Sequence, residues 1–242
     1  MASILPIVIL NARPAAGKSE IIRYLMSVPL NEREQRFKIG RLKILDDFPI
    51  LWNWFEEDDL LEGEFHLPRL HSTPDHYFLR REFWHVLIRR LSQEYEKWNR
   101  DAEDGHTAII EFSRGSEHGG YQNAYVHLSD RILERAASLY VQVSFQESFR
   151  KNRERFNPER PGSILEHALD DEKMRSIYQE DDWVQFSAKD PAYLNVRNYR
   201  LPYAVLNNEN DVTTLGGPEL GLKLEAVFQH LWMLWKQERK LT

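Results

Sequence analysis

A short apolar segment, a polar loop and an amphipathic segment succeed one another within residues 4–28, and this order constrains the fold more than any other feature. Residues 4–10 are nearly all apolar and rich in branched side chains, which is typical of a strand covered on both faces of a parallel sheet. The apolar residues after the loop share one helix face, and a proline lies just past them: Ile21, Ile22, Leu25, Met26 and Pro29. The sequence therefore predicts a strand, a tight loop and a helix at the start of the chain.

The same alternation continues along the chain. Apolar or alternating segments at residues 41–46, 107–113, 139–145 and 203–206 predict four further strands. Helical spacing predicts helices between them, the clearest of which begins at the hydroxyl and proline of residues 73–75, and another begins at Pro218. This order predicts an α/β fold, a three-layer sandwich with a five-stranded parallel sheet. We expect residues 1–242 to form a single domain with a helical insertion at about residues 48–104.

Composition excludes several classes of protein. The chain has 42% hydrophobic residues and no cysteine, so we expect a folded core, and disulfides, thiolate zinc sites and cysteine nucleophiles are excluded. No apolar run approaches the roughly 20 residues of a membrane helix, and the first apolar segment lacks the flanks of a signal peptide. The expected compartment is the cytoplasm. A net charge of −6 disfavours a nucleic-acid partner but allows small phosphate-bearing ligands.

The loop after the first predicted strand has the sequence Ala12-Arg13-Pro14-Ala15-Ala16-Gly17-Lys18-Ser19 and differs from the phosphate-binding pattern G-x-x-x-x-G-K-S only at its first residue. The pattern supplies backbone N–H groups around an anion, a lysine for the β- and γ-phosphates, and a hydroxyl for Mg²⁺. Ala12 replaces a glycine, so it either has a compatible backbone conformation or strains the loop. A chance match is the alternative, and the position between strand and helix favours nucleotide binding.

With this loop in this context, the chain resembles the P-loop kinases of small substrates within the P-loop NTPase superfamily, which include nucleoside and nucleotide kinases and the antibiotic and sugar kinases built like them. The resemblance implies a sheet of P-loop NTPase type, ATP and Mg²⁺ as cofactors, and a nucleoside triphosphate and a small-molecule acceptor as partners. It also implies that the loop and the start of the helix bind the nucleotide through Arg13, Pro14, Ala15, Ala16, Gly17, Lys18, Ser19 and Glu20.

A pair of carboxylates, Asp46 and Asp47, ends the second predicted strand. Ligands of open α/β sheets lie beyond the carboxyl ends of the strands, so one of the pair can accept a proton from the acceptor hydroxyl. The resemblance points the same way. The alternative is a cap for the helix that begins near Pro49, and each residue could take one role. Trp52 follows closely and is a candidate substrate contact, although aromatic residues at helical spacing are more often part of a core.

A charged residue, Glu111, lies near the end of the third predicted strand. Because a buried acid is costly unless it is paired, we expect Glu111 to act with Ser19 on Mg²⁺, directly or through water. An internal salt bridge is the alternative. Arg114 follows three residues later and could hold a substrate or a phosphate, or could be an exposed loop residue.

A basic segment follows the fourth predicted strand. At least two of its cations can converge on one anion, because residues 150 and 153 share one helix face and residues 151 and 155 share another. The resemblance identifies residues 149–163 as an arginine-bearing lid over the triphosphate, with Arg150 and Arg153 in catalysis and Arg155 on the nucleotide. Pro158, Pro161 and Gly162 would break the helix at its hinge. The alternative is a solvated helix with interspersed acids.

These features together predict an ATP- and Mg²⁺-dependent phosphotransferase that acts on a hydroxyl or phosphate of a small molecule. The alternative is a nucleotide-binding protein without phosphotransferase activity, in which Ala12 marks a loop that does not turn over ATP. A kinase of nucleic-acid ends is a third class, which the acidic composition disfavours.

Overall fold

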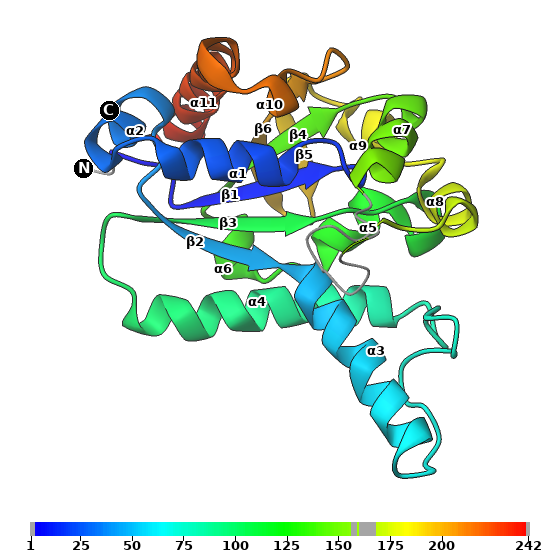
Figure 1. Ribbon diagram of the computed structural model, residues 1–242. Coiled ribbons are helices and arrows are strands. Elements are labelled where there is room, and N and C mark those ends of the chain that lie inside the picture. Colours follow the sequence, from blue (N-terminus) through cyan, green and yellow to red (C-terminus); the bar gives the residue numbers. More distant parts are fainter. Residues whose placement is uncertain (1–2, 156–158, 160–167, 241–242) are drawn as a thin grey trace.

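One sheet organises the molecule (Figure 1). The computed structural model describes residues 3–155, 159 and 168–240. Within these residues, six strands form the sheet in the order β2-β3-β1-β4-β6-β5. Their bounds are β1 (Ile7–Ala12), β2 (Arg41–Asp46), β3 (His106–Phe112), β4 (Ala136–Gln142), β5 (Tyr193–Val196) and β6 (Tyr199–Asn207). All neighbours pair in parallel except β5, which is antiparallel to β6. The prediction of an α/β fold is confirmed.

The prediction of a five-stranded, wholly parallel sheet is wrong, because the described part of the chain contains a sixth, antiparallel strand at one edge. β5 has four residues and is joined to β6 by the two residues Arg197 and Asn198, between the paired Val196 and Tyr199. Arg197 adopts a positive φ of 52°. A turn of this kind usually carries Asn-Gly or Asp-Gly, so this hairpin lacks the signal by which a sequence reveals one.

Helices cover both faces of the sheet. One core contains side chains of α1 (Lys18–Ser27), α2 (Leu30–Phe37), α10 (Val212–Leu215) and α11 (Gly217–Glu238). The other contains side chains of α4 (Phe83–Asp101), α5 (Gly120–Val126), α6 (Asp130–Leu133) and α9 (Trp183–Ser187). Along β1, Ile7 and Ile9 enter the second core while Val8 and Leu10 enter the first. The strand is therefore apolar throughout because both of its faces are buried, which gives the molecule three layers.

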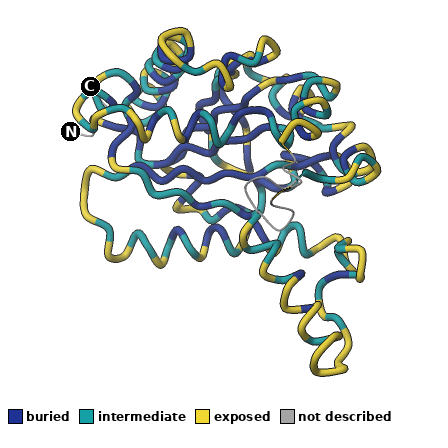
Figure 2. Tube along the Cα trace, in the orientation of Figure 1, coloured by how far each residue is buried: buried dark blue, intermediate teal, exposed yellow. Residues whose placement is uncertain are grey.

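An arm leaves the sheet at the end of β2. It consists of α3 (Asp47–Gly63) and residues 64–82, and it projects beyond the other elements (Figure 1). Much of it is exposed, in contrast to the sheet (Figure 2). The carboxylate of Asp58 is fully buried and holds the returning segment on α3. It accepts hydrogen bonds from the backbone N–H groups of Leu70 (2.8 Å), His71 (3.0 Å) and Ser72 (2.6 Å) and from the Ser72 hydroxyl (2.8 Å).

The helix start predicted at residues 73–75 is wrong, because α4 begins at Phe83. Thr73 instead closes a turn: its carbonyl accepts from the N–H of His76 at 2.9 Å, and its hydroxyl accepts from the N–H of Tyr77 at 3.2 Å. His76 has a positive φ of 58°, which no helix accommodates. The hydroxyl and proline that resemble a helix cap are therefore turn residues here.

Three short elements lie beyond the carboxyl ends of the parallel strands: η1 (Ser116–His118), α7 (Phe145–Arg155) and α8 (Asp171–Tyr178). They surround the end of β1 together with the first turns of α1 and α3 (Figure 1). No helix in the described part of the chain combines the length and the apolarity that a membrane crossing requires.

Candidate functional site

The ends of β1 and β3 form the point at which the chain reverses its direction across the sheet. β1 continues into α1 on one face and leads toward β2, whereas β3 continues into α5 on the other face and leads toward β4. A crevice opens at such a point in α/β sheets, and ligands bind there. The two ends are in contact here, because Lys18 Nζ donates a hydrogen bond to Ser113 Oγ at 2.8 Å.

The predicted phosphate loop lies between β1 and α1. Ala15 and Gly17 have positive φ angles of 55° and 108°. Glycine is required at position 17, because a Cβ there would also lie 2.3 Å from Thr213 Oγ1. The loop carbonyls of Ala12, Pro14 and Ala16 accept hydrogen bonds from side chains of other elements: Tyr121 Oη at 2.9 Å, Ser148 Oγ at 2.7 Å and Asn208 Nδ2 at 2.9 Å. The loop shape is thus fixed by its surroundings.

Ala12 has a backbone conformation that suits an alanine. It is the last residue of β1, pairs with Val141 of β4 and is fully buried. An extended strand residue does not need the freedom of glycine, so the replacement of the first glycine of the pattern causes no strain.

The side chain of Arg13 turns away from the loop. It pairs with Asp181 at 2.7 Å and donates to the carbonyl oxygens of Val143, Tyr178 and Gln179 at 3.3–3.4 Å. This network fastens the loop to the end of α8. The Arg13 guanidinium is therefore engaged in holding the loop in place.

Two cavities meet at the phosphate loop. The larger has a volume of about 680 Å³ and is lined by side chains of α3, residues 64–82, α4, η1, α7 and α8. The smaller has a volume of about 230 Å³ and lies over the loop, where it is bounded by Lys151, Glu154, Asp211 and Thr214. Both cavities are lined by Ala15, Lys18, Ser19 and Arg155. Pro14 lines the larger, and Ala16, Gly17 and Glu20 line the smaller.

Two carboxyl groups face each other on neighbouring strands in the larger cavity. Asp46 is opposite Glu111 in the register of β2 and β3, and their side chains are hydrogen-bonded. Burial and the negative charge of Glu111 raise the pKa of Asp46 to about 7. Burial also raises the pKa of Glu111, although the Lys18 ammonium opposes this shift. Both shifts favour the protonated form of the pair. Asp46 also caps α3, since its Oδ1 accepts from the N–H of Phe48 at 3.0 Å.

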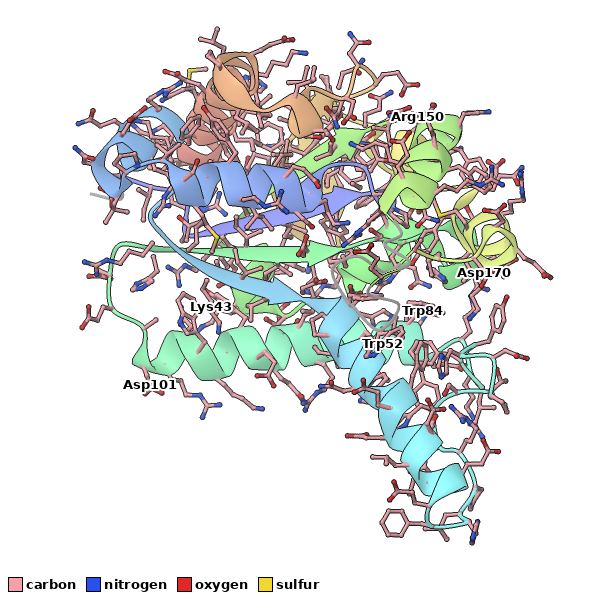
Figure 3. All side chains as sticks on the ribbon, viewed as in Figure 1. Lys43, Trp52, Trp84, Asp101, Arg150 and Asp170 are labelled. Atoms are coloured by element: carbon pink, nitrogen blue, oxygen red, sulfur yellow. The ribbon has the colours of Figure 1, made fainter. Side chains whose placement is uncertain are left out.

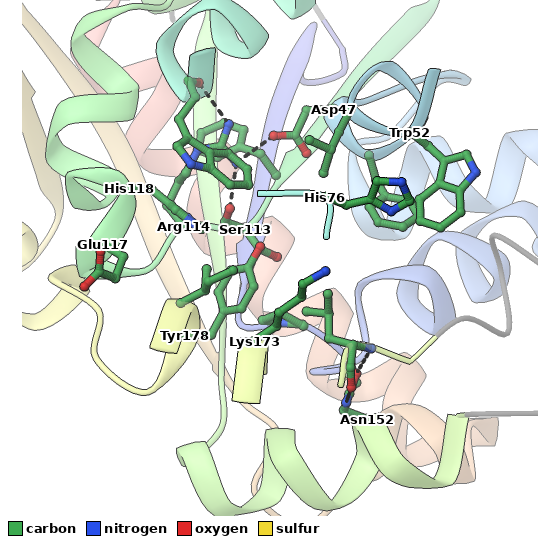
Figure 4. Close-up of a pocket in the computed structure, with 18 of the residues that line it drawn as sticks. Asp47, Trp52, His76, Ser113, Arg114, Glu117, His118, Asn152, Lys173 and Tyr178 are labelled. Atoms are coloured by element: carbon green, nitrogen blue, oxygen red, sulfur yellow. Dashed lines mark hydrogen bonds and ion pairs between the residues drawn. The ribbon is translucent and has the colours of Figure 1, made fainter. Parts of the chain in front are cut away.

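Asp47 and Arg114 form a buried ion pair with an N–O distance of 2.6 Å (Figure 4). Asp47 is 7% exposed and Arg114 is 2% exposed, so the alternative of an exposed loop arginine is wrong. The guanidinium also donates to the Ser113 carbonyl at 2.6 Å and lies over the ring of Trp84. Burial raises the pKa of Asp47, and the positive charge of Arg114 opposes that rise. The pair links the ends of β2 and β3, and both residues line the larger cavity.

Aromatic side chains form one wall of the larger cavity. Trp52 lies near Phe48, Phe55 and His76, with ring centroids 5.9–6.5 Å apart. Trp84 lines the same cavity from the start of α4 (Figure 3). Sequence spacing favoured a core for this group of aromatic residues, and the structure brings part of it to the cavity instead.

The predicted lid at residues 149–163 is only partly described, because residues 156–158 and 160–163 lie outside the described residues. Arg150 pairs with Glu147 and Glu154, each at 2.6 Å, and Arg153 pairs with Asp171. Neither arginine lines the two cavities, whereas Arg155 lines both. Lys151 lines the smaller cavity and pairs with Asp211. The structure thus brings Arg155 and Lys151 to the loop and leaves Arg150 and Arg153 with acidic partners on the surface of α7 and α8.

Sequence reasoning missed several residues of this site. Ser113 directly follows β3, so the rule that ligands lie at the carboxyl ends of strands could have identified it. The sequence places Lys151 on one helix face with Arg155, but the prediction gave a role to Arg155 alone. Lys173 and Tyr178 of α8 also line the larger cavity. They are distant in sequence from every motif, and only the fold brings them there.

The donors around Lys18 fit Mg²⁺. Ser19 offers a hydroxyl oxygen and Glu111 a carboxylate, and both line the larger cavity. In nucleotide-dependent enzymes this ion is held by one or two protein oxygens together with phosphates and waters rather than by a complete protein cage. The described residues contain no group of three or more His, Cys, Asp or Glu side chains arranged to hold a metal.

Comparisons with known proteins add little to this description. No protein-family model matches the chain, and no curated protein matches it. A solved chain described as "Crystal structure of APE1195" is 15% identical, with 92% of this chain and 96% of that chain covered and a TM-score of 0.36. A likeness at this TM-score carries no argument about fold or function.

Proposed function

We propose that this chain is an ATP- and Mg²⁺-dependent phosphotransferase of the P-loop kinase type that acts on a hydroxyl or phosphate of a small molecule. The observation that carries the proposal is the position of Lys18 and Ser19 in the lining of both cavities. A triphosphate held on the loop from the smaller cavity would end at the larger one, next to Asp46 and Glu111. Phosphoryl transfer depends on such positioning of donor and acceptor.

The residues around the loop have separate roles in this proposal. The loop backbone and Lys18 hold the β- and γ-phosphates, and Lys151 and Arg155 approach the triphosphate from α7, the described part of the predicted lid. Ser19 and Glu111 hold Mg²⁺, which neutralises phosphate charge when bound. Arg150 and Arg153 would need to leave their acidic partners to act in catalysis.

Asp46 is the proposed general base. It lines the larger cavity and lies across from Glu111, so it is next to the point where an acceptor hydroxyl would meet the γ-phosphate. Its pKa of about 7 suits a base that operates near neutral pH. Asp47 is engaged with Arg114, so we assign it to the support of the site rather than to proton transfer.

Thermal unfolding with Mg·ATP tests nucleotide binding first. Wild type should be stabilised, by about 2.7 kcal/mol when ATP is present at 100 times its Kd, because the ligand binds only the folded state. Lys18→Ala should lose this stabilisation. Lys43→Ala, on β2 and outside both cavities, should keep it. Equal stabilisation of all three proteins would contradict the phosphate-loop assignment.

Acceptor-dependent release of ADP tests transfer. Wild type is incubated with Mg·ATP and a panel of hydroxyl- and phosphate-bearing small molecules, and ADP is measured with and without each acceptor. If the chain is a kinase, ADP release increases with the concentration of acceptors of one class, and Lys18→Ala abolishes this release. Stabilisation by ATP without any acceptor-dependent ADP supports the alternative, a nucleotide-binding protein without transfer.

A further inference from the structure

The wall of the larger cavity opposite the phosphate loop is built from aromatic rings that come from three separate parts of the chain. α3, the segment of residues 64–82 and the start of α4 each contribute, and the rings are Phe48, Trp52, Phe55, His76, Phe78 and Trp84. Figure 4 shows Trp52 and His76 side by side at the cavity, apart from the ion pair of Asp47 and Arg114.

The orientation of these rings is fixed by their neighbours. Phe55 and His76 are stacked, with centroids 4.8 Å apart and planes at 4°. Trp52 meets both of them edge-on, at 6.5 and 6.1 Å. Stacked and edge-to-face pairs are the favoured arrangements of aromatic side chains. The wall is therefore preorganised, and a ligand that lies against it need not order the rings first.

The cations that line this cavity already have partners. Lys173 donates to the carbonyl of Asp75 and lies over the ring of Tyr77, and Arg81 donates to the carbonyl of Ser116 at 3.2 Å. Arg114 is paired with Asp47. The aromatic wall offers ring faces and edges rather than hydrogen-bonding groups, so it favours a flat apolar surface on the part of a ligand that lies against it.

We propose that the acceptor carries a planar aromatic ring system that lies against Trp52 and Phe55, with its reacting hydroxyl directed toward Asp46 and Lys18. The identification of this ligand as the acceptor, and of its hydroxyl as the reacting group, rests on the proposed function. The preference of the cavity for an aromatic ligand does not rest on it. A volume of about 680 Å³ matches the size of sites that enclose ligands of this kind.

A matched pair of probes tests the preference. 2-Naphthalenemethanol and decahydro-2-naphthalenemethanol have the same carbon skeleton and are both primary alcohols, but only the first is flat and aromatic. Titration calorimetry on wild type should give 2-naphthalenemethanol an affinity at least tenfold higher, the scale of a stacking interaction. Equal affinity for the two probes overturns the proposal.

Three variants locate the preference. Trp52→Leu keeps an apolar side chain but removes the plane, and should reduce the preference to about threefold or less. Trp54→Leu is the control, because Trp54 lies on the same helix, stacks on His71 at 5.0 Å and does not line the cavity. It should keep the preference, and an equal reduction in both variants overturns the proposal. Phe48→Leu is a second change in the same wall, and its result decides if Trp52→Leu does not fold.

Titration of Lys18→Ala separates this proposal from the proposed function. The preference for 2-naphthalenemethanol should persist in that variant, because ring binding does not require the nucleotide. If the preference persists while wild type shows no ATP-dependent stabilisation, the proposed function fails and the aromatic site stands. If ATP acts as expected while the two probes bind equally, the aromatic site fails alone.

Discussion

The two cavities beside Lys18 are built in different ways. The smaller is formed mainly by consecutive residues, 15–20, at the junction of one strand and one helix, with α7 and residues 211–214 beside it. The larger is assembled from six segments that are distant in sequence. The difference shows that the proposed donor side is a local motif, whereas the proposed acceptor side is a product of the whole fold. A change in the arm should therefore alter one side and leave the other intact.

Substitution of the neighbouring carboxylates Asp46 and Asp47 should have the largest effects, one on stability and the other on activity. Asp47→Asn leaves the charge of Arg114 buried without its counter-ion, and we expect a loss of about 3 kcal/mol of unfolding free energy. Asp46→Asn keeps an amide oxygen that can cap α3, and should cost little stability but lower phosphoryl transfer by about a hundredfold or more. Chemical denaturation and ADP release measure the two effects. Full activity in Asp46→Asn would contradict its role as base.

The pH dependence of stability checks the same residue. A carboxyl whose pKa is raised on folding stabilises the folded state at low pH and loses that contribution as pH rises. For Asp46 the window lies between pH 3.8 and about pH 7. The unfolding free energy of wild type, relative to that of Asp46→Asn, should therefore fall as the pH rises across this window. A difference that is constant with pH would show that Asp46 does not retain its proton.

Asp58→Ala tests whether the arm can be destabilised without a change at the predicted phosphate loop. It removes the acceptor of three backbone N–H groups and one hydroxyl, and we expect a local loss of about 2 kcal/mol. Hydrogen exchange should accelerate at Leu70, His71 and Ser72, while ATP-dependent stabilisation is retained. Asp59→Ala, which removes an exposed partner of Arg69 and His76 but no backbone acceptor of residues 70–72, is the control and should accelerate exchange less. Loss of the ATP response in Asp58→Ala would contradict the independence of the two sides.

Ala12→Gly should have the smallest effect. Ala12 is an extended strand residue, so glycine offers no conformational gain and costs about 0.5–1 kcal/mol of stability. The affinity for ATP should change by less than about threefold, as judged by titration. ATP binding that appears only in Ala12→Gly would show that the wild-type loop is degenerate, and would remove the nucleotide-binding alternative as well.

The extent to which the sequence predicts this molecule follows the same division. The first three strands and the loop follow from local patterns, and one rule about parallel sheets places Asp46 and Glu111 at the same edge of the sheet. Their opposition depends on strand order and register, which no local pattern gives. The ion pair of Asp47 and Arg114 could not be predicted for the same reason, because no local pattern relates the end of β2 to the residue that follows β3 by two positions. The turn at Thr73 and the hairpin of β5 were not predicted for another reason. The residues of the turn carry the signals of a helix start, and the residues of the hairpin carry no turn signal.

The start of α3 connects the arm directly to the residues of the candidate site. Asp46 caps this helix and Asp47 is its first residue, and 17 residues of helix extend about 25 Å from that point. The Asp58 network ties the returning segment to the helix. One continuous helix therefore joins the arm to Asp46, the proposed base, and to the ion pair of Asp47 and Arg114. A ligand that changes the position of the arm would be expected to reach these residues through the first turn of α3.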